Sequence, residues 1–411
     1  MTPEFERALS QYAELIVKIG LNVQPGQRLL IRAPLEAAPL VRQVTIHAYQ
    51  AGAHLVDVIW ADPQLLRIRF QHAPRNSFAE HSDWGWKAGL ETVDAGGAIL
   101  SINGTDPDLL KGIDPGLIAT VQRTESRAAL PLSKRISADA INWCVVGYAT
   151  AAWAAKVFPD MAPGEQLNRL WDAIFSTIRL DTPDPLAAWE AHNEDLTRRA
   201  AYLNEKQYDA LRYTGPGTDL TVGLPENHHW IGGPAPTAIG ISNVANLPTE
   251  EVFTAPHRER VDGTVRATMP LNLRGNLIEN FSLSFSNGRV TNVSAEKGEA
   301  LLRSQIEMDD GASRLGEVAL VPHSSAISHA GILFYNTLYD ENASSHLALG
   351  RAYRNCIAGL ADAGDETFMA HGGNLSANHL DFMVGSGEID IDGITADGTR
   401  EPLMRQGEWA Y

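Results

Sequence analysis

The N-terminal part of the sequence alternates apolar, strand-like runs with helix-like segments, and this alternation constrains the fold more than any other feature. Apolar side chains recur every three or four positions over residues 4–19, a spacing that predicts an amphipathic helix. Residues 28–32 and 54–60 have the character of strands, and a helical pattern over 39–52 separates them. A strand, a helix and a strand joined by short connections form a parallel α/β unit. Further strands are expected at 98–102 and 143–148.

The periodicity changes near residue 200. Helical patterns at 149–157, 163–179 and 186–202 precede short alternating segments at 207–213, 220–224, 260–266, 280–286 and 289–295, with one clear helix at 298–307. Turn signals such as Ser286-Asn287-Gly288 separate the alternating segments, which is typical of antiparallel sheet. We therefore expect an α/β N-terminal domain over 1–200 with a largely parallel sheet. A second, α+β domain over 201–411 should contain a mainly antiparallel sheet.

Composition excludes several classes of partner. The formal net charge of the 411-residue chain is −17, which disfavours nucleic acids and anionic membranes because both are bound by basic surfaces. No run of about 18 apolar residues and no signal-peptide pattern is present, so we expect a cytoplasmic protein. With Cys144 and Cys356 as its two cysteines, the chain has neither a disulfide framework nor the ligands for a thiolate zinc site.

Carboxylates, imidazoles and a phenol gather in the segment 316–381, which supplies Glu317, Asp340, Glu341, His346, Tyr353, His379 and Asp381. Carboxylate oxygens combined with imidazole nitrogens suit zinc, manganese or cobalt. In an extended segment His379 and Asp381 point to the same face, because strand side chains repeat every second residue. The segment therefore predicts a divalent metal site, although a single H-x-D also occurs as a hydrogen-bonded surface pair.

Other residues offer weaker signals. Thirteen histidines in the chain are not an unusual number, and His54, which opens an apolar strand, is expected to be structural. His228 and His229 are adjacent and would face opposite ways in a strand, which disfavours a shared metal. In the segment 246–256, by contrast, Glu250 and Glu251 lie between proline and apolar residues, so at least one of them is expected to face an enclosed site.

Four motifs together resemble the thermophilic M29 metallo-aminopeptidase family: N-L-P-T-E-E-V-F-T-A-P-H, G-E-V-A-L-V, Y-D-E-N-A-S-S-H-L-A-L-G-R-A-Y and N-H-L-D-F-M-V-G-S. The resemblance extends along the whole chain, including R-L-L-I-R-A-P and A-G-A-H-L-V-D-V in the N-terminal half. It implies a homodimer that removes N-terminal residues from peptides with a free N-terminus, using two divalent ions (zinc, cobalt or manganese). The implied metal ligands are Glu251, Glu317, His346, His379 and Asp381, with Glu341 as an additional ligand, and Tyr353 is the implied active-site tyrosine.

The sequence leaves the roles of several of these residues open. Glu317 or Asp381 would bridge two ions, and Glu250 or Glu251 would lie near the attacking water as ligand or base. Tyr353 would donate a hydrogen bond to the tetrahedral oxyanion, or would be a core residue on the same helix face as His346, seven positions earlier. Two other functions compete with the aminopeptidase: a ring-cleaving dioxygenase with one Fe(II), and a catalytically silent peptide-binding protein.

Overall fold

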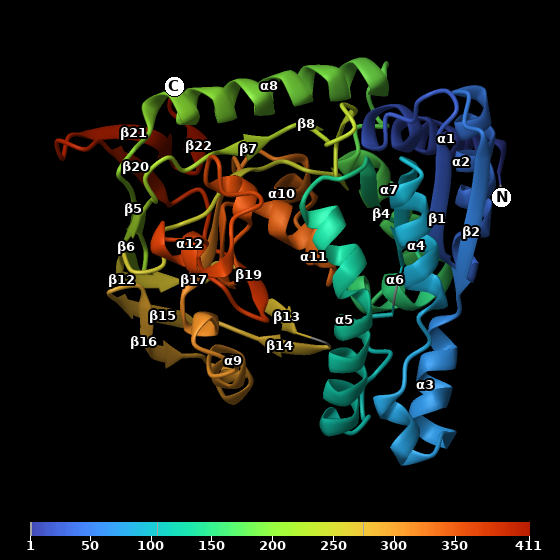
Figure 1. Cartoon of the computed structure of the whole chain (residues 1–411), viewed down its shortest axis with the longest axis horizontal. Coiled ribbons are helices and arrows are strands. Elements are labelled where there is room, and N and C mark those ends of the chain that lie inside the picture. The colour runs from blue at the N-terminus through green and yellow to red at the C-terminus, as the bar shows by residue number, and fades with distance from the viewer. Residues whose placement is uncertain (1, 105, 274) are drawn as a thin grey trace. The chain divides into compact units, whose positions relative to one another are not determined.

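The computed structural model describes residues 2–104, 106–273 and 275–411, and divides into two compact units (Figure 1). The first comprises Met1–Ala191 and Pro234–Pro248, and the second comprises His192–Gly233 and Thr249–Tyr411. The predicted division was 1–200 and 201–411. The change of unit instead lies within helix α8 (Pro185–Lys206), and the segment 234–248 returns to the first unit because its strand β10 pairs with β4.

The first unit contains the parallel sheet that its strand–helix–strand pattern predicted. Its described strands have the order β10-β4-β3-β1-β2 and every neighbouring pair is parallel. They are β1 (Arg28–Pro34), β2 (Leu55–Ala61), β3 (Ala98–Asn103), β4 (Trp143–Gly147) and β10 (Asn246–Leu247), with a separate hairpin of β8 (Ala235–Pro236) and β9 (Ser242–Asn243).

Helices connect and cover these strands. They are α1 (Pro3–Leu15), α2 (Ala38–Gln50), α3 (Pro63–His72), α4 (Trp84–Asp94), α5 (Pro115–Ser137), α6 (Ala151–Val157), α7 (Pro163–Thr177) and α8, with short helical segments η1 (Ile16–Gly20), η2 (Leu35–Ala37) and η3 (Arg75–Ala79). Helix starts follow local chemistry. Asp62, Asp114 and Thr150 each accept a hydrogen bond from a backbone N–H in the first turn of α3, α5 and α6, respectively. Proline occupies the first position of α3 and α5, where its missing N–H costs nothing.

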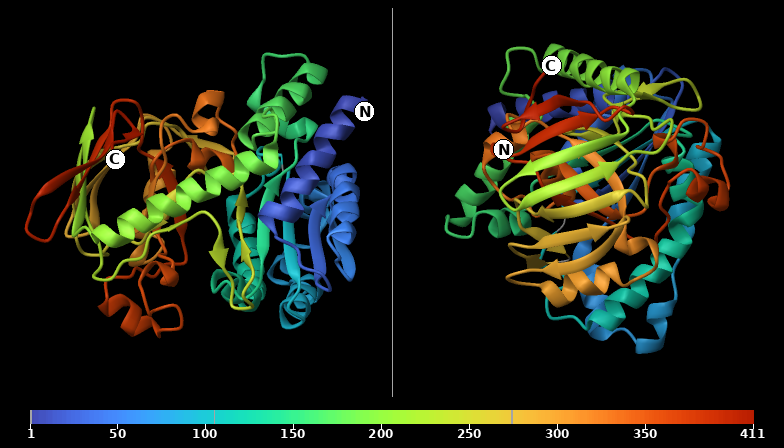
Figure 2. Two further views of the ribbon diagram at one scale, coloured as in Figure 1. Left: turned by 90° about the horizontal axis from the view of Figure 1, so that it is seen from above. Right: turned by 90° about the vertical axis from the view of Figure 1, so that its left-hand side faces the viewer.

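The described strands of the second unit pair in an antiparallel manner, as predicted, and most of them belong to two large sheets. One has the order β19-β18-β17-β11-β7 and consists of β7 (Ile231–Gly232), β11 (Val252–Thr254), β17 (Leu315–Leu320), β18 (His346–Gly350) and β19 (His379–Met383). The other has the order β16-β15-β12-β6-β5-β20-β21-β22 (Figure 2, right) and consists of β5 (Ala210–Gly215), β6 (Thr218–Gly223), β12 (Val261–Arg266), β15 (Ser282–Ser286), β16 (Arg289–Ser294), β20 (Asp390–Ile394), β21 (Arg400–Arg405) and β22 (Glu408–Trp409).

One hydrophobic core joins the two sheets, with Leu347, Leu349 and Phe382 from the first and Tyr213 and Phe285 from the second. The remaining elements are the hairpin β13 (Leu271–Leu273) and β14 (Asn276–Ile278), helices α9 (Glu299–Ile306), α10 (Ala326–Ala330), α11 (Thr337–Asp340) and α12 (Asp365–Ala370), and short helical segments η4 (Gly311–Ser313), η5 (Glu341–Ala343) and η6 (Arg354–Cys356). No helix in the described ranges is both long and apolar enough to cross a membrane.

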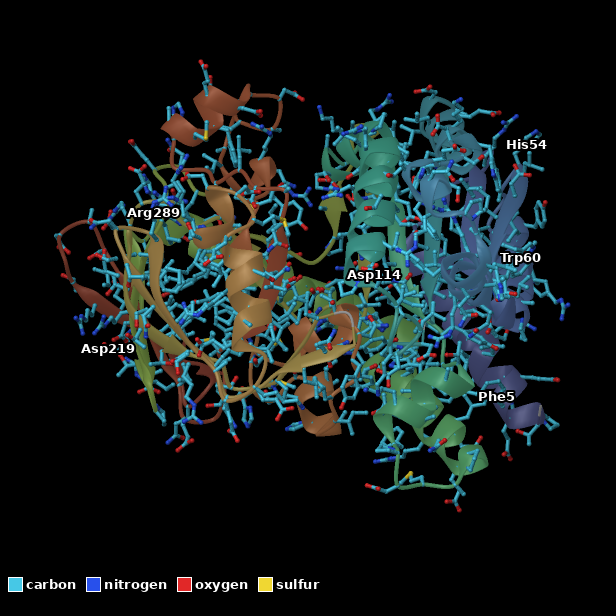
Figure 3. The ribbon with its side chains drawn as sticks, turned by 90° about the horizontal axis from the view of Figure 1, so that it is seen from below. Phe5, His54, Trp60, Asp114, Asp219 and Arg289 are labelled. Atoms are coloured by element: carbon cyan, nitrogen blue, oxygen red, sulfur yellow. The ribbon has the colours of Figure 1, made fainter. Side chains whose placement is uncertain are left out.

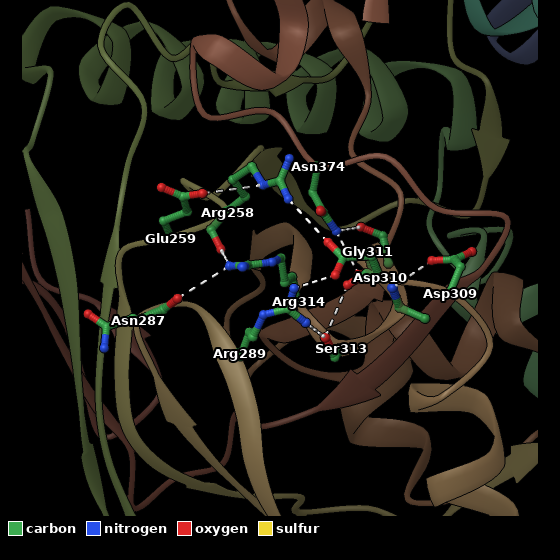
Figure 4. Close-up of polar contacts among 12 residues, drawn as sticks. Arg258, Glu259, Asn287, Arg289, Asp309, Asp310, Gly311, Ser313, Arg314 and Asn374 are labelled. Carbon is green, nitrogen blue, oxygen red and sulfur yellow. Dashed lines mark hydrogen bonds and ion pairs between the residues drawn. The ribbon is translucent and has the colours of Figure 1, made fainter. Parts of the chain in front are cut away.

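A buried polar network fixes the end of β17 and the facing end of β18 (Figure 4). Arg314, which is 7% exposed, donates from Nη1 to the carbonyl oxygens of Arg258 (2.6 Å) and Asn287 (3.2 Å), and its own carbonyl accepts from the Gly350 N–H. The Asn374 amide donates to the carbonyls of Gly311 and Gly350. Charged and amide groups without access to water are costly unless they are hydrogen-bonded, so this network specifies one arrangement of the two strands.

Candidate metal centre

On β17, β18 and β19, side chains that enter the hydrophobic core alternate with side chains on the opposite face, which carries the potential metal ligands. Leu347 and Leu349 of β18 contribute to the core, whereas His346 and Ala348 alternate with them and face the opposite side. The same alternation sends Val318 of β17 and Leu380 and Phe382 of β19 into the core. It leaves Glu317, His379 and Asp381 on the face that carries His346.

The first potential ligand group consists of Glu251, Glu317 and His346. Glu251, immediately before β11, has Oε2 3.2 Å from His346 Nε2, and Glu317 has Oε1 3.3 Å from the same nitrogen. All three residues are buried, at 9%, 6% and 1% exposed for Glu251, Glu317 and His346. One ligand atom from each lies within 4.8 Å of the others, so a single cation can contact all three.

The second group shares Glu317 with the first. Glu317 Oε2 lies 3.8 Å from His379 Nε2, which lies 3.2 Å from Asp381 Oδ1. The predicted same-face arrangement of His379 and Asp381 is thus confirmed, because both lie on β19. Glu317 turns one carboxylate oxygen to each group, as a bridging ligand must.

Ala348 provides the space between the groups. It pairs directly with Glu317 on β17 and with Asp381 on β19, and it is fully buried. Because the three residues share one face of the sheet, a side chain larger than a methyl group at this position would project between the two carboxylates.

Backbone carbonyls orient both imidazoles. His346 Nδ1 lies 3.2 Å from the Ser344 carbonyl oxygen, and His379 Nδ1 lies 2.7 Å from that of Arg351. A carbonyl can only accept, so each Nδ1 is the protonated nitrogen in the neutral ring. Nε2 is then available, and this is the arrangement seen around histidine ligands of metals.

The electrostatics of the site follow from burial and crowding of carboxylates. Burial raises the pKa of Glu317, although the His346 hydrogen bond opposes this shift. Burial alone would lower the pKa of both imidazoles, but the neighbouring carboxylates have the larger combined effect. The pKa of His346 therefore rises well above its usual value, and that of His379 rises to about 9. For Asp381, burial acts to raise the pKa and the neighbouring His379 reverses the shift. Without a metal, protons on the imidazoles therefore balance the carboxylates, and cations can replace those protons.

Tyr353 lies beside the second group, but not on a helix with His346. His346 begins strand β18, and Tyr353 follows it in the turn before η6, so the predicted shared helix face was wrong. The Tyr353 ring lies 5.3 Å from the His379 ring between centroids and 6.1 Å from the Phe253 ring. Burial, together with Glu317 and Asp381, raises the pKa of Tyr353, which keeps the phenol neutral and able to donate.

Glu250 and Glu341 lie outside both groups of three. The Glu250 N–H donates to Asn342 Oδ1 (2.8 Å), and its Oε2 lies 3.7 Å from Nε2 of His192 on α8. Glu341 borders a small cavity whose wall also includes Asp381 and Asp340. Burial, then Asp381 and Glu251, raise the pKa of Glu341 well above its usual value, so its carboxylate lies in the field of the site.

The remaining histidines considered from the sequence lie elsewhere. His54 is exposed at the surface of the first unit (Figure 3). His228 is buried, with Nδ1 3.0 Å from the Pro225 carbonyl oxygen, which is a structural contact. Neither it nor His229 contributes to a potential metal group among the described residues.

Three residues that shape the site were not found from the sequence. Ala348 and Asn342 lie within the Y-D-E-N-A-S-S-H-L-A-L motif, yet a small apolar residue and an amide carry no metal signal of their own. His192 comes from α8, far from the motifs, and its ring Nε2 lies 2.8 Å from the Thr249 carbonyl oxygen. Only the tertiary structure brings it to the segment that carries Glu250 and Glu251.

Comparison with known proteins identifies the family of the chain. The sequence model of the family described as thermophilic metalloprotease (M29) matches residues 5–409. Aminopeptidase 2 of Geobacillus stearothermophilus is 48% identical over 99% of this chain and 98% of its own length. Aminopeptidase T of Thermus thermophilus is 45% identical over 98% of this chain and 99% of its own. The solved structure of wild-type AmpT from Thermus thermophilus superimposes with a TM-score of 0.94 at 44% identity, covering 99% of this chain and all of that one. The chain therefore belongs to the M29 family of metallopeptidases, enzymes that hydrolyse peptide bonds, as its motifs predicted.

Proposed function

We propose that the protein is an aminopeptidase that removes N-terminal residues from peptides with two divalent metal ions. The observation that carries the proposal is the shared carboxylate: Glu317 belongs to both ligand groups and directs one oxygen to each. Glu251, Glu317 and His346 would hold one ion, and Glu317, His379 and Asp381 the other. We assign Glu341 as an additional ligand because its carboxylate lies in the field of Asp381 and Glu251. Zinc, cobalt and manganese all suit these donors.

When bound, paired ions polarise a scissile carbonyl and lower the pKa of a water held between them. The chain's own residues orient and complete this chemistry. The carbonyl contacts of His346 and His379 hold their Nε2 atoms toward the site. Tyr353, neutral because its pKa is raised, donates its phenolic proton toward the developing oxyanion.

We assign the ligand role in the N-L-P-T-E-E motif to Glu251 rather than Glu250. Glu251 Oε2 lies 3.2 Å from His346 Nε2, whereas Glu250 Oε2 lies 3.7 Å from His192 Nε2. Since adjacent residues of an extended segment point in opposite directions, Glu251 would face the metal centre and Glu250 would contact α8.

The N-terminus of a peptide substrate would lie at the small cavity beside Asp381 and Glu341. Glu341 is the candidate acceptor for its protonated amine, because both carboxylate oxygens of Asp340 already accept from the backbone N–H groups of Phe334 and Asn336. An endopeptidase has no need for such a concentration of acidic groups. The acidic wall is thus the feature that favours exopeptidase action on a free α-amino group.

The assay that tests the proposal compares leucine p-nitroanilide with its N-acetylated counterpart. We expect hydrolysis of the free-amine substrate, inhibition by a chelator and recovery with zinc, cobalt or manganese. Equal rates on both substrates would contradict aminopeptidase action. Bound metal without turnover of either substrate would favour a catalytically silent peptide-binding protein. One iron per chain without amide hydrolysis would favour the ring-cleaving dioxygenase.

The family resemblance also leads us to propose a cytoplasmic homodimer. Size-exclusion chromatography with light scattering should give twice the chain mass of 44.7 kDa. A strictly monomeric protein would contradict this part of the proposal without affecting the chemistry.

A further inference from the structure

A second cavity lies in the first unit, over the parallel sheet and beneath helices α4 and α5. On this face the paired residues of β1, β3 and β4 form two rows across the strands. The first row is Leu30, Ile99 and Trp143. The second row, two residues further along each strand, is Arg32, Ser101 and Val145. The first row belongs to the hydrophobic core under the helices. The second row forms the floor of a cavity of about 210 Å³ whose walls include Trp86 of α4 and Leu132 of α5.

Arg32 is the charged group of this cavity. Its guanidinium carbon lies 4.2 Å from the centroid of the Trp86 ring, which holds the group in place by a cation–π contact. Burial lowers the pKa of Arg32, and no nearby carboxylate contributes to the shift. Arg28, on the same strand, instead has Glu91 at 3.5 Å. Within the described ranges, Arg32 is thus a half-buried cation with no acidic partner, in a chain whose net charge is −17.

The other polar groups of the cavity are also hydrogen-bond donors. The indole Nε1 of Trp143 is buried and has no hydrogen-bond partner among the described residues. Ser101 and Ser133 add hydroxyl groups to an otherwise apolar wall. Among the residues that the structure describes, no aspartate or glutamate lines the cavity, so none of them balances a ligand's ammonium group.

These features define the ligand chemistry. A guanidinium presents two parallel N–H donors that match a carboxylate, and a lone arginine without lysines or a backbone nest suits a monoanion rather than a phosphate. Trp86, Trp143 and Leu132 accommodate an aliphatic or aromatic body.

We propose that this cavity binds a small monocarboxylate that has an apolar body and no charged amino group, such as an N-acylated or 2-oxo acid. The site goes beyond the peptidase function, because every residue that lines it belongs to the first unit and every potential metal ligand to the second.

Isothermal titration calorimetry on the metal-loaded protein tests the proposal with N-acetyl-L-leucine as the probe. We expect saturable binding of one molecule per chain at this site. N-acetyl-L-leucinamide, which lacks the carboxylate, and leucine, which carries an ammonium group, should bind about tenfold more weakly or worse. Fluorescence should respond in parallel, because Trp86 and Trp143 line the cavity.

Variants locate the binding. Arg32→Met should weaken binding of N-acetyl-L-leucine by about tenfold or more, whereas the matched control Arg28→Met should leave it unchanged. Ser133 of α5 is solvent-exposed and also lines the cavity, so Ser133→Phe should obstruct the cavity without altering its charge and should also weaken binding. The absence of binding to the wild-type protein, equal affinity for the amide, or undiminished binding in both the Arg32 and Ser133 variants would overturn the proposal.

Discussion

Replacing Glu317 by glutamine removes the charge that the two ligand groups share while keeping the size of the side chain. Its carboxylate oxygens lie 3.3 Å from His346 Nε2 and 3.8 Å from His379 Nε2, so the substitution affects both groups at once. An amide offers one neutral oxygen and cannot bridge two cations. We expect kcat/KM for leucine p-nitroanilide to fall by about 10³-fold or more, which corresponds to ~4 kcal/mol of transition-state stabilisation.

Folding should survive this change. Glutamine is nearly isosteric with glutamate, and the imidazoles can release protons once the carboxylate is gone, so no buried charge is left uncompensated. Urea unfolding followed by circular dichroism should remain a single transition, while the metal content falls. Glu366→Gln makes the same chemical change at an exposed position in α12 and serves as the control. An active Glu317→Gln protein with a full complement of metal would refute the assigned role.

Three further substitutions or conditions test other parts of the account. Ala348→Leu should project a larger side chain between Glu317 and Asp381 and cost most of the bound metal, whereas Ala200→Leu, in the core of the second unit, would disturb packing away from the ligands; metal analysis of the folded proteins distinguishes them. Because the pKa of the metal-free His379 is raised to about 9, protons compete with metal below that pH, so metal affinity measured against a chelator should rise between pH 6 and 9, and a flat profile would contradict the predicted competition. Arg314→Met removes a buried guanidinium that donates to two backbone carbonyls and should lower the free energy of unfolding by about 3 kcal/mol, compared with a much smaller loss for the more exposed Arg289→Met.

The class of each sheet was predictable because it depends on local periodicity. Alternating strands and helices before residue 200 give parallel pairing, and short strands joined by tight turns after it give antiparallel pairing. The return of β10 to the first sheet was not predictable. That pairing involves two residues, Asn246 and Leu247, which carry no signal for a partner about a hundred positions away.

The candidate site, like the fold, was predictable only in part. His379 and Asp381 could be placed on one face from strand geometry alone, and the remaining ligands came from the family resemblance. Tyr353 was assigned a possible helical relation to His346 from its spacing, but the rest of strand β18 and a short loop separate them. Spacing predicts a shared face only when the secondary structure is already known. The role of Ala348 depends on cross-strand register, which no local pattern encodes.

The most direct test of the central claim is the number of metal ions per chain. Plasma mass spectrometry on the purified protein, combined with the leucine p-nitroanilide assay before and after chelation, measures it. Two divalent ions per chain in the wild-type protein, with activity lost on chelation and restored with zinc, cobalt or manganese, is the predicted result. A single ion that supports full activity, or activity that survives complete removal of metal, would contradict a centre in which Glu317 joins two metal sites.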